Sequence, residues 1–201
     1  MPQPQESPDF AGAEKFMLHR LKEELSPDLP YHALHHTLDV LNAAMQIAAH
    51  EDIASSEILL LRIAVIFHDA GFLLAYHGHE EKSCGLATEI LPKFGFTKEQ
   101  VEKICRLIMA TKMPQQPRSL PEQIICDADL DYVGRKNASV IANRLYRELK
   151  LRKEVSSKKE WYKTQIAFLE SHHYHTSFSK KERNTGKQEY LRMLKEKLAQ
   201  A

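Results

Sequence analysis

The longest apolar stretch of the chain covers residues 58–67 and is interrupted only by Arg62. A helix that is apolar on nearly all sides belongs in a protein core rather than on a surface. The stretch is much shorter than the roughly 20 residues that a helix needs to cross a bilayer, so it is not a membrane segment. The pattern therefore predicts that the stretch Ile58–Phe72 contains a buried central helix, which ends with His68 and Asp69 where it gives way to Gly71.

Amphipathic spacing and end signals predict further helices on both sides of this segment. Apolar residues recur at helical spacing from Phe10 to Leu25 and from Tyr31 to about His50. A helix from His79 to Lys93 is expected to be closed by Gly95. A Ser or Thr followed three residues later by Gln or Glu is typical of a capping box, and such pairs mark four more helix starts: Thr97/Gln100, Ser119/Glu122, Ser157/Glu160 and Ser179/Glu182.

The same pattern predicts the fold class and the domain organisation. The helix that contains the sequence CDADLDYVG is expected to end at Gly134. No stretch alternates apolar and polar residues with period two, so no β-sheet is expected. We predict one all-α domain, a single helical bundle over residues 9–201, after a disordered N-terminus at residues 1–8. The part of the domain that contains the candidate metal site covers about 31–134, and C-terminal helices occupy 136–199.

Composition and charge argue against several classes of protein. The 201 residues, 43% of them hydrophobic, can bury a core as one domain. A net charge of +1 offers no electrostatic reason to expect a nucleic-acid or membrane partner. The N-terminus lacks the basic and apolar regions of a signal peptide. Cys84, Cys105 and Cys126 are far apart and lie among apolar residues, which indicates reduced structural thiols. These features favour a cytoplasmic protein.

Histidine is the most informative part of the composition, because seven of the 11 histidines fall between positions 32 and 79. His32 and His36 are four residues apart, so on a helix they share one face. Such a pair is either a polar face or a metal ligand beside a proton donor. The buried His68 and Asp69 favour the second interpretation, because a buried carboxylate needs a compensating charge.

The acidic cluster Asp127, Asp129 and Asp131 supplies a further candidate ligand. At about 100° per residue, Asp127 and Asp129 point about 200° apart, so one regular helix cannot direct both at the same ion. Asp127 and Asp131 share a face with Gln123, which predicts a polar stripe that solvent can reach. Asp129 lies on the apolar face and is the expected ligand. Two imidazoles and two carboxylates suit a divalent Mn, Fe, Ni, Co, Zn or Mg ion.

The ordered set of His36, His68-Asp69 and an aspartate in a DADL context resembles the H…HD…D signature of HD-domain metal-dependent phosphohydrolases. The chain also has the Tyr-His-x-x-x-His opening of the cyclic-nucleotide phosphodiesterases in that superfamily. The resemblance implies an all-α bundle of the HD type in which His36, His68, Asp69 and Asp129 hold a metal. It further implies that His32 is the general acid and that a metal-activated water attacks a phosphorus atom.

The resemblance implies a reaction class rather than one substrate. Its members hydrolyse deoxynucleotides, nucleoside di- and triphosphates, cyclic nucleotides, cyclic dinucleotides and (p)ppGpp. We expect hydrolysis of a phosphoester or phosphoanhydride in a small phosphorylated substrate such as a nucleotide or cyclic nucleotide. Lys112 and Arg135 are candidate catalytic cations for the phosphate oxygens. His77, His79 and Asp127 are candidates for lining the site, although the two cations and both histidines also suit surface positions.

Two alternatives stay open from the sequence. One is a di-iron oxygenase of the same fold, in which further histidines hold a second iron. The other is a non-catalytic, metal-binding regulatory module, although His32 beside a complete ligand set argues against it. For the His172–His175 run, which lies at a helix end, we expect a solvated turn rather than a metal-binding tract. A homodimer is left open.

Overall fold

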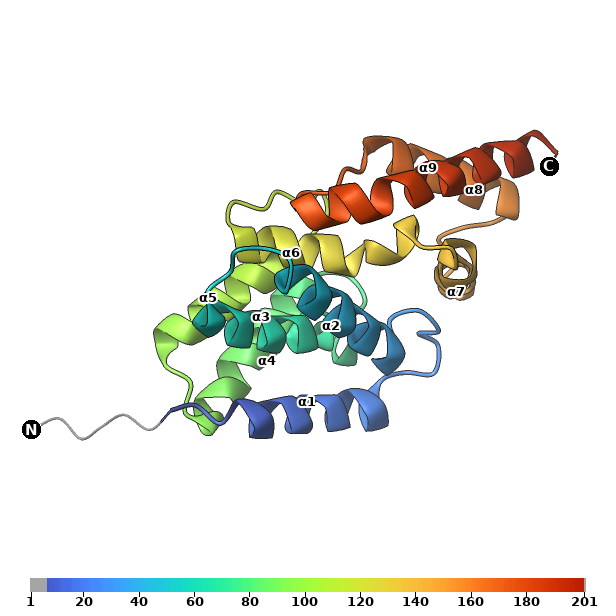
Figure 1. Cartoon of the computed structure of the whole chain (residues 1–201). Helices are drawn as coiled ribbons and strands as arrows, with labels where there is room; N and C mark the ends of the chain where they lie inside the picture. The colour runs from blue at the N-terminus through green and yellow to red at the C-terminus, as the bar shows by residue number, and fades with distance from the viewer. Residues whose placement is uncertain (1–6, 201) are drawn as a thin grey trace, which may run out of the picture.

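The computed structural model describes residues 7–200, which form nine α-helices, three short 3-10 helices and no strand (Figure 1). The all-α prediction is therefore confirmed. The predicted disorder at residues 1–8 falls mostly outside the described residues. In chain order the elements are α1 (Phe10–Glu24), α2 (Leu34–Ala48), α3 (Ser55–Phe67), η1 (Ala70–Leu73), α4 (His79–Ile90), η2 (Leu91–Phe94), α5 (Lys98–Ala110), α6 (Leu120–Asp129), η3 (Asp131–Gly134), α7 (Ala138–Leu151), α8 (Lys158–Ser171) and α9 (Ser177–Ala199).

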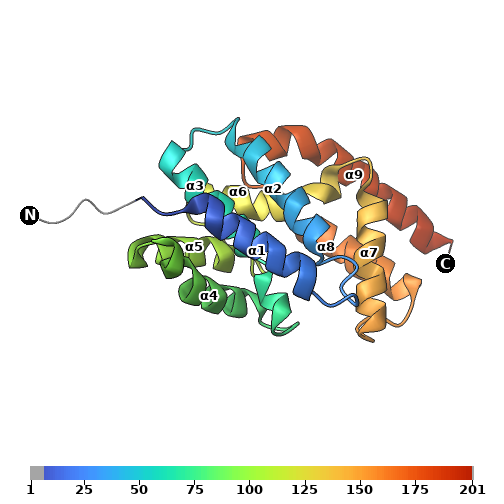
Figure 2. The ribbon, with the colours of Figure 1, turned by 90° about the horizontal axis from the view of Figure 1, so that it is seen from below.

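Helix α3 is the centre of the larger core, as its apolar sequence predicts. Residues 63–67 have no exposed surface. The helix packs against α1, α2, α5 and α6, and Figure 2 shows α1 lying across this core. Arg62, the only charged residue in the apolar stretch, reaches out to α1 and donates two hydrogen bonds of 2.6 Å to Glu14. Its charge is thus kept at the edge of the core.

The apolar side chains form two clusters, one around α3 and one among the C-terminal helices. The second cluster includes Trp161 and Tyr174, and in it α8 packs along α9 (Figure 1). Tyr31 and Tyr132 belong to this second cluster, with ring centroids 5.8 Å apart. The Tyr31 ring also lies 4.6 Å from the His36 ring on α2. His36 therefore lies where the two clusters meet.

Helix α2 begins at Leu34 and not near Tyr31 as predicted. The residues before it form a bend, because the N–H groups of Tyr31 and His32 donate to Oε2 of Glu148 at 2.9 and 3.1 Å. His32 and His36 are consequently not one turn apart on a single helix. Their ring centroids still lie 5.8 Å apart, because the bend brings His32 back beside the start of α2.

Helix α6 ends at Asp129 and not at Gly134 as predicted. Leu130 interrupts the helix, and the following four residues form the tighter helix η3. The rotation of 100° per residue therefore does not extend to Asp131.

Several predicted helix ends are confirmed. Thr97 and Gln100 form the full capping box at the start of α5. Ser157 caps α8 by accepting a hydrogen bond of 3.2 Å from the N–H of Glu160. Gly95, in the left-handed conformation with φ of 79°, ends the helical segment that begins with α4.

Two predicted helix caps differ from those in the structure. Thr176 rather than Ser179 caps α9, because the Thr176 hydroxyl accepts from the N–H of Ser179 at 3.2 Å. Ser119 precedes α6 but makes no capping hydrogen bond with its side chain. The Glu122 carboxylate instead accepts from the N–H of Arg118 at 2.6 Å.

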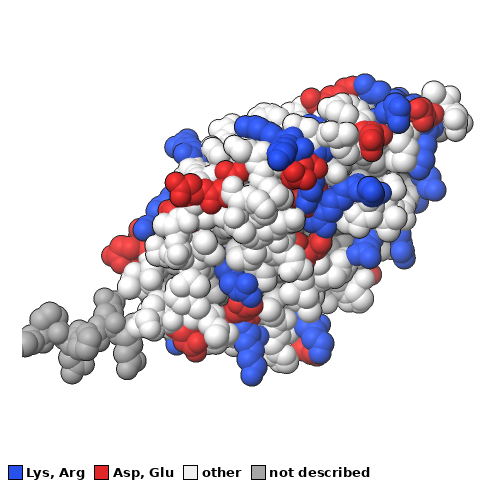
Figure 3. Space-filling view, in the orientation of Figure 1, with Lys and Arg blue, Asp and Glu red and all other residues white. Residues whose placement is uncertain are grey.

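Within residues 7–200, none of the helices has both the length and the apolar character that a membrane crossing requires. On the face shown in Figure 3, acidic and basic side chains lie interspersed. This distribution agrees with the small net charge of the sequence.

Candidate metal centre

The four side chains expected as ligands lie together at the junction of α2, α3 and α6. Nε2 of His36 lies 3.4 Å from Oδ2 of Asp69 and 3.2 Å from Oδ1 of Asp129. Nε2 of His68 lies 3.3 and 3.6 Å from the same two oxygens. Each imidazole thus faces both carboxylates. Ligand atoms of His36, His68 and Asp69 all lie within 4.8 Å of one another.

The turn after α3 places His68 and Asp69. The Ser83 hydroxyl of α4 donates to the carbonyl oxygen of His68 and accepts from the N–H of Gly71, each at 2.7 Å. A side chain at Gly71 would collide with α4, because its Cβ would lie 1.9 Å from the carbonyl oxygen of His79. The serine and the glycine together hold the turn against α4.

The donor atoms fit a divalent cation. Nδ1 of His68 lies 2.7 Å from the carbonyl oxygen of Val65, an acceptor, so Nδ1 carries the proton and Nε2 is left with a lone pair. The Nε2 atoms of His36 and His68 and Oδ2 of Asp69 are buried and have no hydrogen-bond partner among the described residues. Such orphaned polar atoms are costly. A metal ion with mixed nitrogen and oxygen ligands would satisfy them.

The electrostatics of the site favour positive charge. Burial lowers the pKa of His36, but the Asp129 and Asp69 carboxylates outweigh this effect and raise the pKa to about 9. The same carboxylates raise the pKa of His68 despite its burial. Burial raises the pKa of Asp69 and Asp129, but the two histidines lower both pKa values below the usual range. The carboxylates are therefore ionised and attract protons or a metal ion.

Glu148 of α7 holds His32 beside these ligands. Its buried Oε1 lies 2.5 Å from Nδ1 of His32 and accepts a hydrogen bond of 3.2 Å from the Tyr76 hydroxyl. Its Oε2 accepts from the N–H groups of Tyr31 and His32. Burial raises the pKa of Glu148, but the hydrogen bond and charge of His32 outweigh it, so the pKa is lowered. An ionised Glu148 keeps the proton of His32 on Nδ1 and leaves Nε2 free of this bond.

Aromatic rings form a wall beside the ligands. The His32 ring stacks on Phe72 with centroids 4.2 Å apart, and Phe72 stacks on His79 at 4.1 Å. Nε2 of His79 lies 3.5 Å from Oδ1 of Asp69, the oxygen that faces away from His36 and His68. The structure therefore places His79, like His32, next to the ligand group.

Two other candidates lie on the surface. The His77 side chain is 85% exposed, and its Nε2 lies 3.6 Å from a carboxylate oxygen of Glu154. The Lys112 ammonium group forms an ion pair with Glu81 and is about half exposed. These contacts direct both side chains toward surface carboxylates rather than toward the ligand group.

Arg135 and Asp131 belong to an ion-pair network. Asp131 is almost fully buried and binds Arg135 as well as Arg183 of α9, the latter at 2.7 Å. Arg135 also donates to both carboxylate oxygens of Asp39, at 2.8 and 3.0 Å. The predicted solvent exposure of Asp131 is wrong, because the break at Leu130 turns the residue inward. The Arg135 guanidinium is occupied by two carboxylates, which leaves its predicted catalytic role without structural support.

Asp127 is also not on a solvent-accessible stripe. Its side chain is fully buried, and Oδ1 accepts from the N–H of His175 at 2.8 Å. Oδ2 accepts from the N–H and the hydroxyl of Thr176 at 2.8 and 2.6 Å. The prediction that Asp127 lines the site is therefore wrong: the residue joins α6 to the start of α9, whose N-terminal N–H groups need acceptors.

The histidine run at residues 172–175 is packed, so the predicted solvated turn is wrong for most of it. Tyr174 is 1% exposed, and both ring nitrogens of His172 are buried without a hydrogen-bond partner among the described residues. Burial, assisted by the charge of Lys187, lowers the pKa of His172 to about 3. His173 is exposed.

Glu148, the residue that orients His32, was not predicted from the sequence. A signal was present, because Ile141, Leu145, Glu148 and Leu149 have the spacing of one helical face. A carboxylate on such an apolar stripe needs a buried partner. The identity of that partner is not encoded locally, since it lies 116 residues away.

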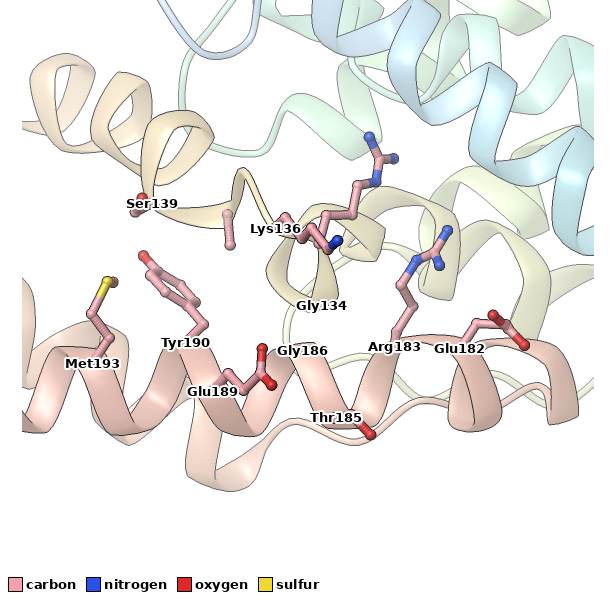
Figure 4. Close-up of a pocket in the computed structure, with 12 residues that line it drawn as sticks. Gly134, Lys136, Ser139, Glu182, Arg183, Thr185, Gly186, Glu189, Tyr190 and Met193 are labelled. Carbon is pink, nitrogen blue, oxygen red and sulfur yellow. The ribbon is translucent and has the colours of Figure 1, made fainter.

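A pocket of about 570 Å³ lies near the ion-pair network rather than at the ligand group (Figure 4). Lys136 and Ser139 line one side, and Arg183 and Tyr190 of α9 line the other. Helices η3 and α9 are in close contact beside this pocket, since a Cβ at Gly186 would lie 2.0 Å from the carbonyl oxygen of Gly134. None of its 12 lining residues is among the four expected ligands.

Comparison with known proteins agrees with this geometry. The family model described as HD domain matches residues 33–131, a range that includes the four expected ligands and excludes His32 and Glu148. A crystal structure described as a predicted HD superfamily hydrolase from an uncultured Thermotogales bacterium is similar in fold, with a TM-score of 0.62 and 20% sequence identity over 96% of this chain and 93% of that chain. No curated protein matches the sequence.

Proposed function

This chain belongs to the HD domain superfamily, and from that premise we propose that it is a metal-dependent phosphohydrolase. The proposed reaction is hydrolysis of a phosphoester or phosphoanhydride in a nucleotide or cyclic nucleotide. One observation carries the proposal: a largely buried set of two imidazoles and two carboxylates lies beside a third imidazole, His32, that a separate carboxylate holds. A ligand set alone would suit many metal proteins, whereas the adjoining proton donor suits hydrolysis.

His36, His68, Asp69 and Asp129 would hold the metal ion. When bound, the ion would supply an activated water and neutralise phosphate oxygens. The protein's contribution begins with the turn after α3, where Ser83 and Gly71 keep His68 and Asp69 in place. It continues with the proton on Nδ1 of His68, which leaves Nε2 as the ligand atom.

His32 would act as the general acid. Glu148 accepts a hydrogen bond from Nδ1–H of His32, which fixes the ring and leaves Nε2 free. The second ring proton, on Nε2, can then pass to the oxygen of the leaving group. After this transfer Nδ1–H still donates to Glu148, so the ring stays in the same orientation for reprotonation. Stacking on Phe72 further restricts the ring.

The test is a substrate screen with the Mn-loaded protein. Nucleotides, cyclic nucleotides and generic phosphoesters are incubated with the wild-type chain and with His68→Ala and His32→Ala variants, and released phosphate and product are measured. The expected result is metal-dependent turnover that His68→Ala loses and that His32→Ala slows by roughly 10²-fold or more. Turnover that is equal in wild type and His68→Ala would contradict the proposal.

A di-iron oxygenase is the second candidate, and one contact favours it. Asp69 faces His36 and His68 with one oxygen and His79 with the other, at 3.5 Å, which is the arrangement of a bridging carboxylate. Buried Glu80 lies 3.6 Å from the same His79 nitrogen. Two iron ions per chain together with oxygen consumption would favour this candidate. Phosphate release without oxygen would favour hydrolysis.

A further inference from the structure

Cys84 of α4 and Cys105 of α5 lie against each other although 21 residues separate them in sequence. Sγ of Cys84 is 3.5 Å from the carbonyl oxygen of Cys105, and Sγ of Cys105 is 3.7 Å from the carbonyl oxygen of Cys84. The cysteines are far apart in the sequence, but the fold brings this pair together. Cys126 has a different environment, since it is buried and donates to the carbonyl oxygen of Ala110 at 3.0 Å.

The reciprocal contacts place the two side chains next to each other. Each sulfur is one bond from its own Cβ, so sulfurs that each reach the other residue's backbone lie between two closely spaced backbones. A disulfide requires this proximity of the two cysteines. Thr88, one turn after Cys84, donates to the Cys84 carbonyl at 2.8 Å and lies 3.9 Å from Sγ of Cys105. The packing of α4 on α5 maintains the arrangement.

Cys105 is both reachable and reactive. It lines an open pocket of about 690 Å³, together with apolar residues such as Val101 and Met109. The neighbouring Cys84 thiol, together with Thr88, lowers the pKa of Cys105 to about 7 in spite of its burial. The neighbouring Cys105 and burial raise the pKa of Cys84. The thiolate is the nucleophilic form of cysteine, and a lowered pKa raises the fraction of Cys105 in that form.

We propose that Cys84 and Cys105 form a reversible disulfide between α4 and α5 on exposure to a peroxide. The Cys105 thiolate attacks one oxygen of hydrogen peroxide, the O–O bond breaks, and hydroxide leaves, so that Cys105 becomes a sulfenic acid. Cys84 then attacks the sulfenic sulfur, an S–S bond forms, the S–O bond breaks, and water leaves with the Cys84 proton. Two thiols and one hydrogen peroxide thus give one disulfide and two waters.

The cysteine pair lies next in sequence to a residue that positions the metal ligands. Cys84 directly follows Ser83, whose hydroxyl holds the turn that contains His68 and Gly71. A covalent bond at Cys84 would therefore form one residue from the hydrogen bonds that position a ligand. Cys126, the thiol nearest in sequence to Asp129, takes no part in the proposed bond.

Tryptic peptide mapping of the full chain tests the proposal. The three cysteines fall on three separate tryptic peptides, residues 83–93, 104–106 and 119–135. Reduced protein is treated with hydrogen peroxide, its free thiols are alkylated without reductant, and the digest is analysed by mass spectrometry. The expected product is peptide 83–93 joined to peptide 104–106, lighter by two hydrogen atoms than their sum, and separated again by dithiothreitol.

Matched variants make the outcome decisive. Cys126→Ser should form the same linked peptide, whereas Cys84→Ser and Cys105→Ser should not. In Cys84→Ser, Cys105 should be trapped by dimedone as its sulfenic acid. The proposal is overturned if peroxide leaves Cys84 and Cys105 alkylated, oxidises either one singly in the wild type, or links either one to Cys126 or to a second chain.

Discussion

Nδ1 of His32 lies 2.5 Å from Oε1 of Glu148, although 116 positions separate the two residues in the chain. The contact joins the bend before α2 to the C-terminal half of α7 and brings a buried carboxylate to the edge of the metal centre. Glu148 lies outside the matched HD domain range, so this chain uses its C-terminal helices to orient the proposed proton donor.

The first prediction concerns metal content. The protein is expected to bind about one transition metal ion per chain, since the four donors form one mixed-ligand site. His68→Ala, Asp69→Ala and Asp129→Asn should each lose most of the metal, because each removes a ligand atom. Elemental analysis is the measurement. The exposed residues His77 and Asp52 provide controls, and His77→Ala and Asp52→Asn should keep the metal. An unchanged metal content in His68→Ala would refute the ligand assignment.

The second prediction separates the proton donor from the ligands. His32→Ala should keep the metal and the fold but slow hydrolysis by roughly 10²-fold or more, the typical contribution of a general acid. A substrate with a good leaving group should be affected less, because it needs less protonation. Metal content and kcat for both substrate types are the measurements. Loss of metal would show that His32 is itself a ligand.

The third prediction concerns Glu148. Glu148→Gln keeps the side-chain shape but removes the negative charge beside His32, so kcat should fall by roughly 10-fold or more while KM changes little. A merely structural role would lower the free energy of unfolding and leave kcat per folded chain unchanged. Glu154→Gln, at a surface carboxylate, is the matched control.

The fourth prediction concerns Asp127, which is expected to be structural. Asp127→Asn should lower the free energy of unfolding by about 1–3 kcal/mol, since the amide cannot accept all three hydrogen bonds from His175 and Thr176. Metal content should be unchanged. Urea denaturation and elemental analysis check the two statements. Asp131→Asn should also destabilise the fold, because it weakens the pairing of Arg135 and Arg183. Metal loss in Asp127→Asn without a change in stability would contradict this assignment.

The fifth prediction is a pH dependence of stability due to His172. Its pKa is about 3 in the folded protein, against about 6.5 in an unfolded chain. Between these pH values the unfolded state binds a proton that the folded state does not, so the contribution of His172 is fully present above about pH 6.5 and declines as the pH falls. His172→Leu should flatten this part of the curve of unfolding free energy against pH. The exposed His173 is the control, and His173→Leu should keep the slope.

Local patterns determined much of what could be predicted. The apolar run that became α3, the end of that helix at His68 and Asp69, and the capping box at Thr97 all depend on residues within a few positions of one another. The sequence also indicates which helix is buried and which carboxylate needs a compensating charge, because both follow from residue types and their spacing. These patterns were enough to predict the all-α class and to select four residues that the structure places together.

The tertiary structure alone decided which distant groups meet. Asp127 and Asp129 are two residues apart and both carboxylates, yet one accepts hydrogen bonds from the start of α9 and the other faces two histidines. Cys84 and Cys105 meet because α4 packs against α5. His32 and Glu148 meet because α7 lies against the bend before α2. Helical periodicity indicates that a side chain faces inward, but the partner it meets depends on how separate helices pack, and that packing is a property of the whole chain.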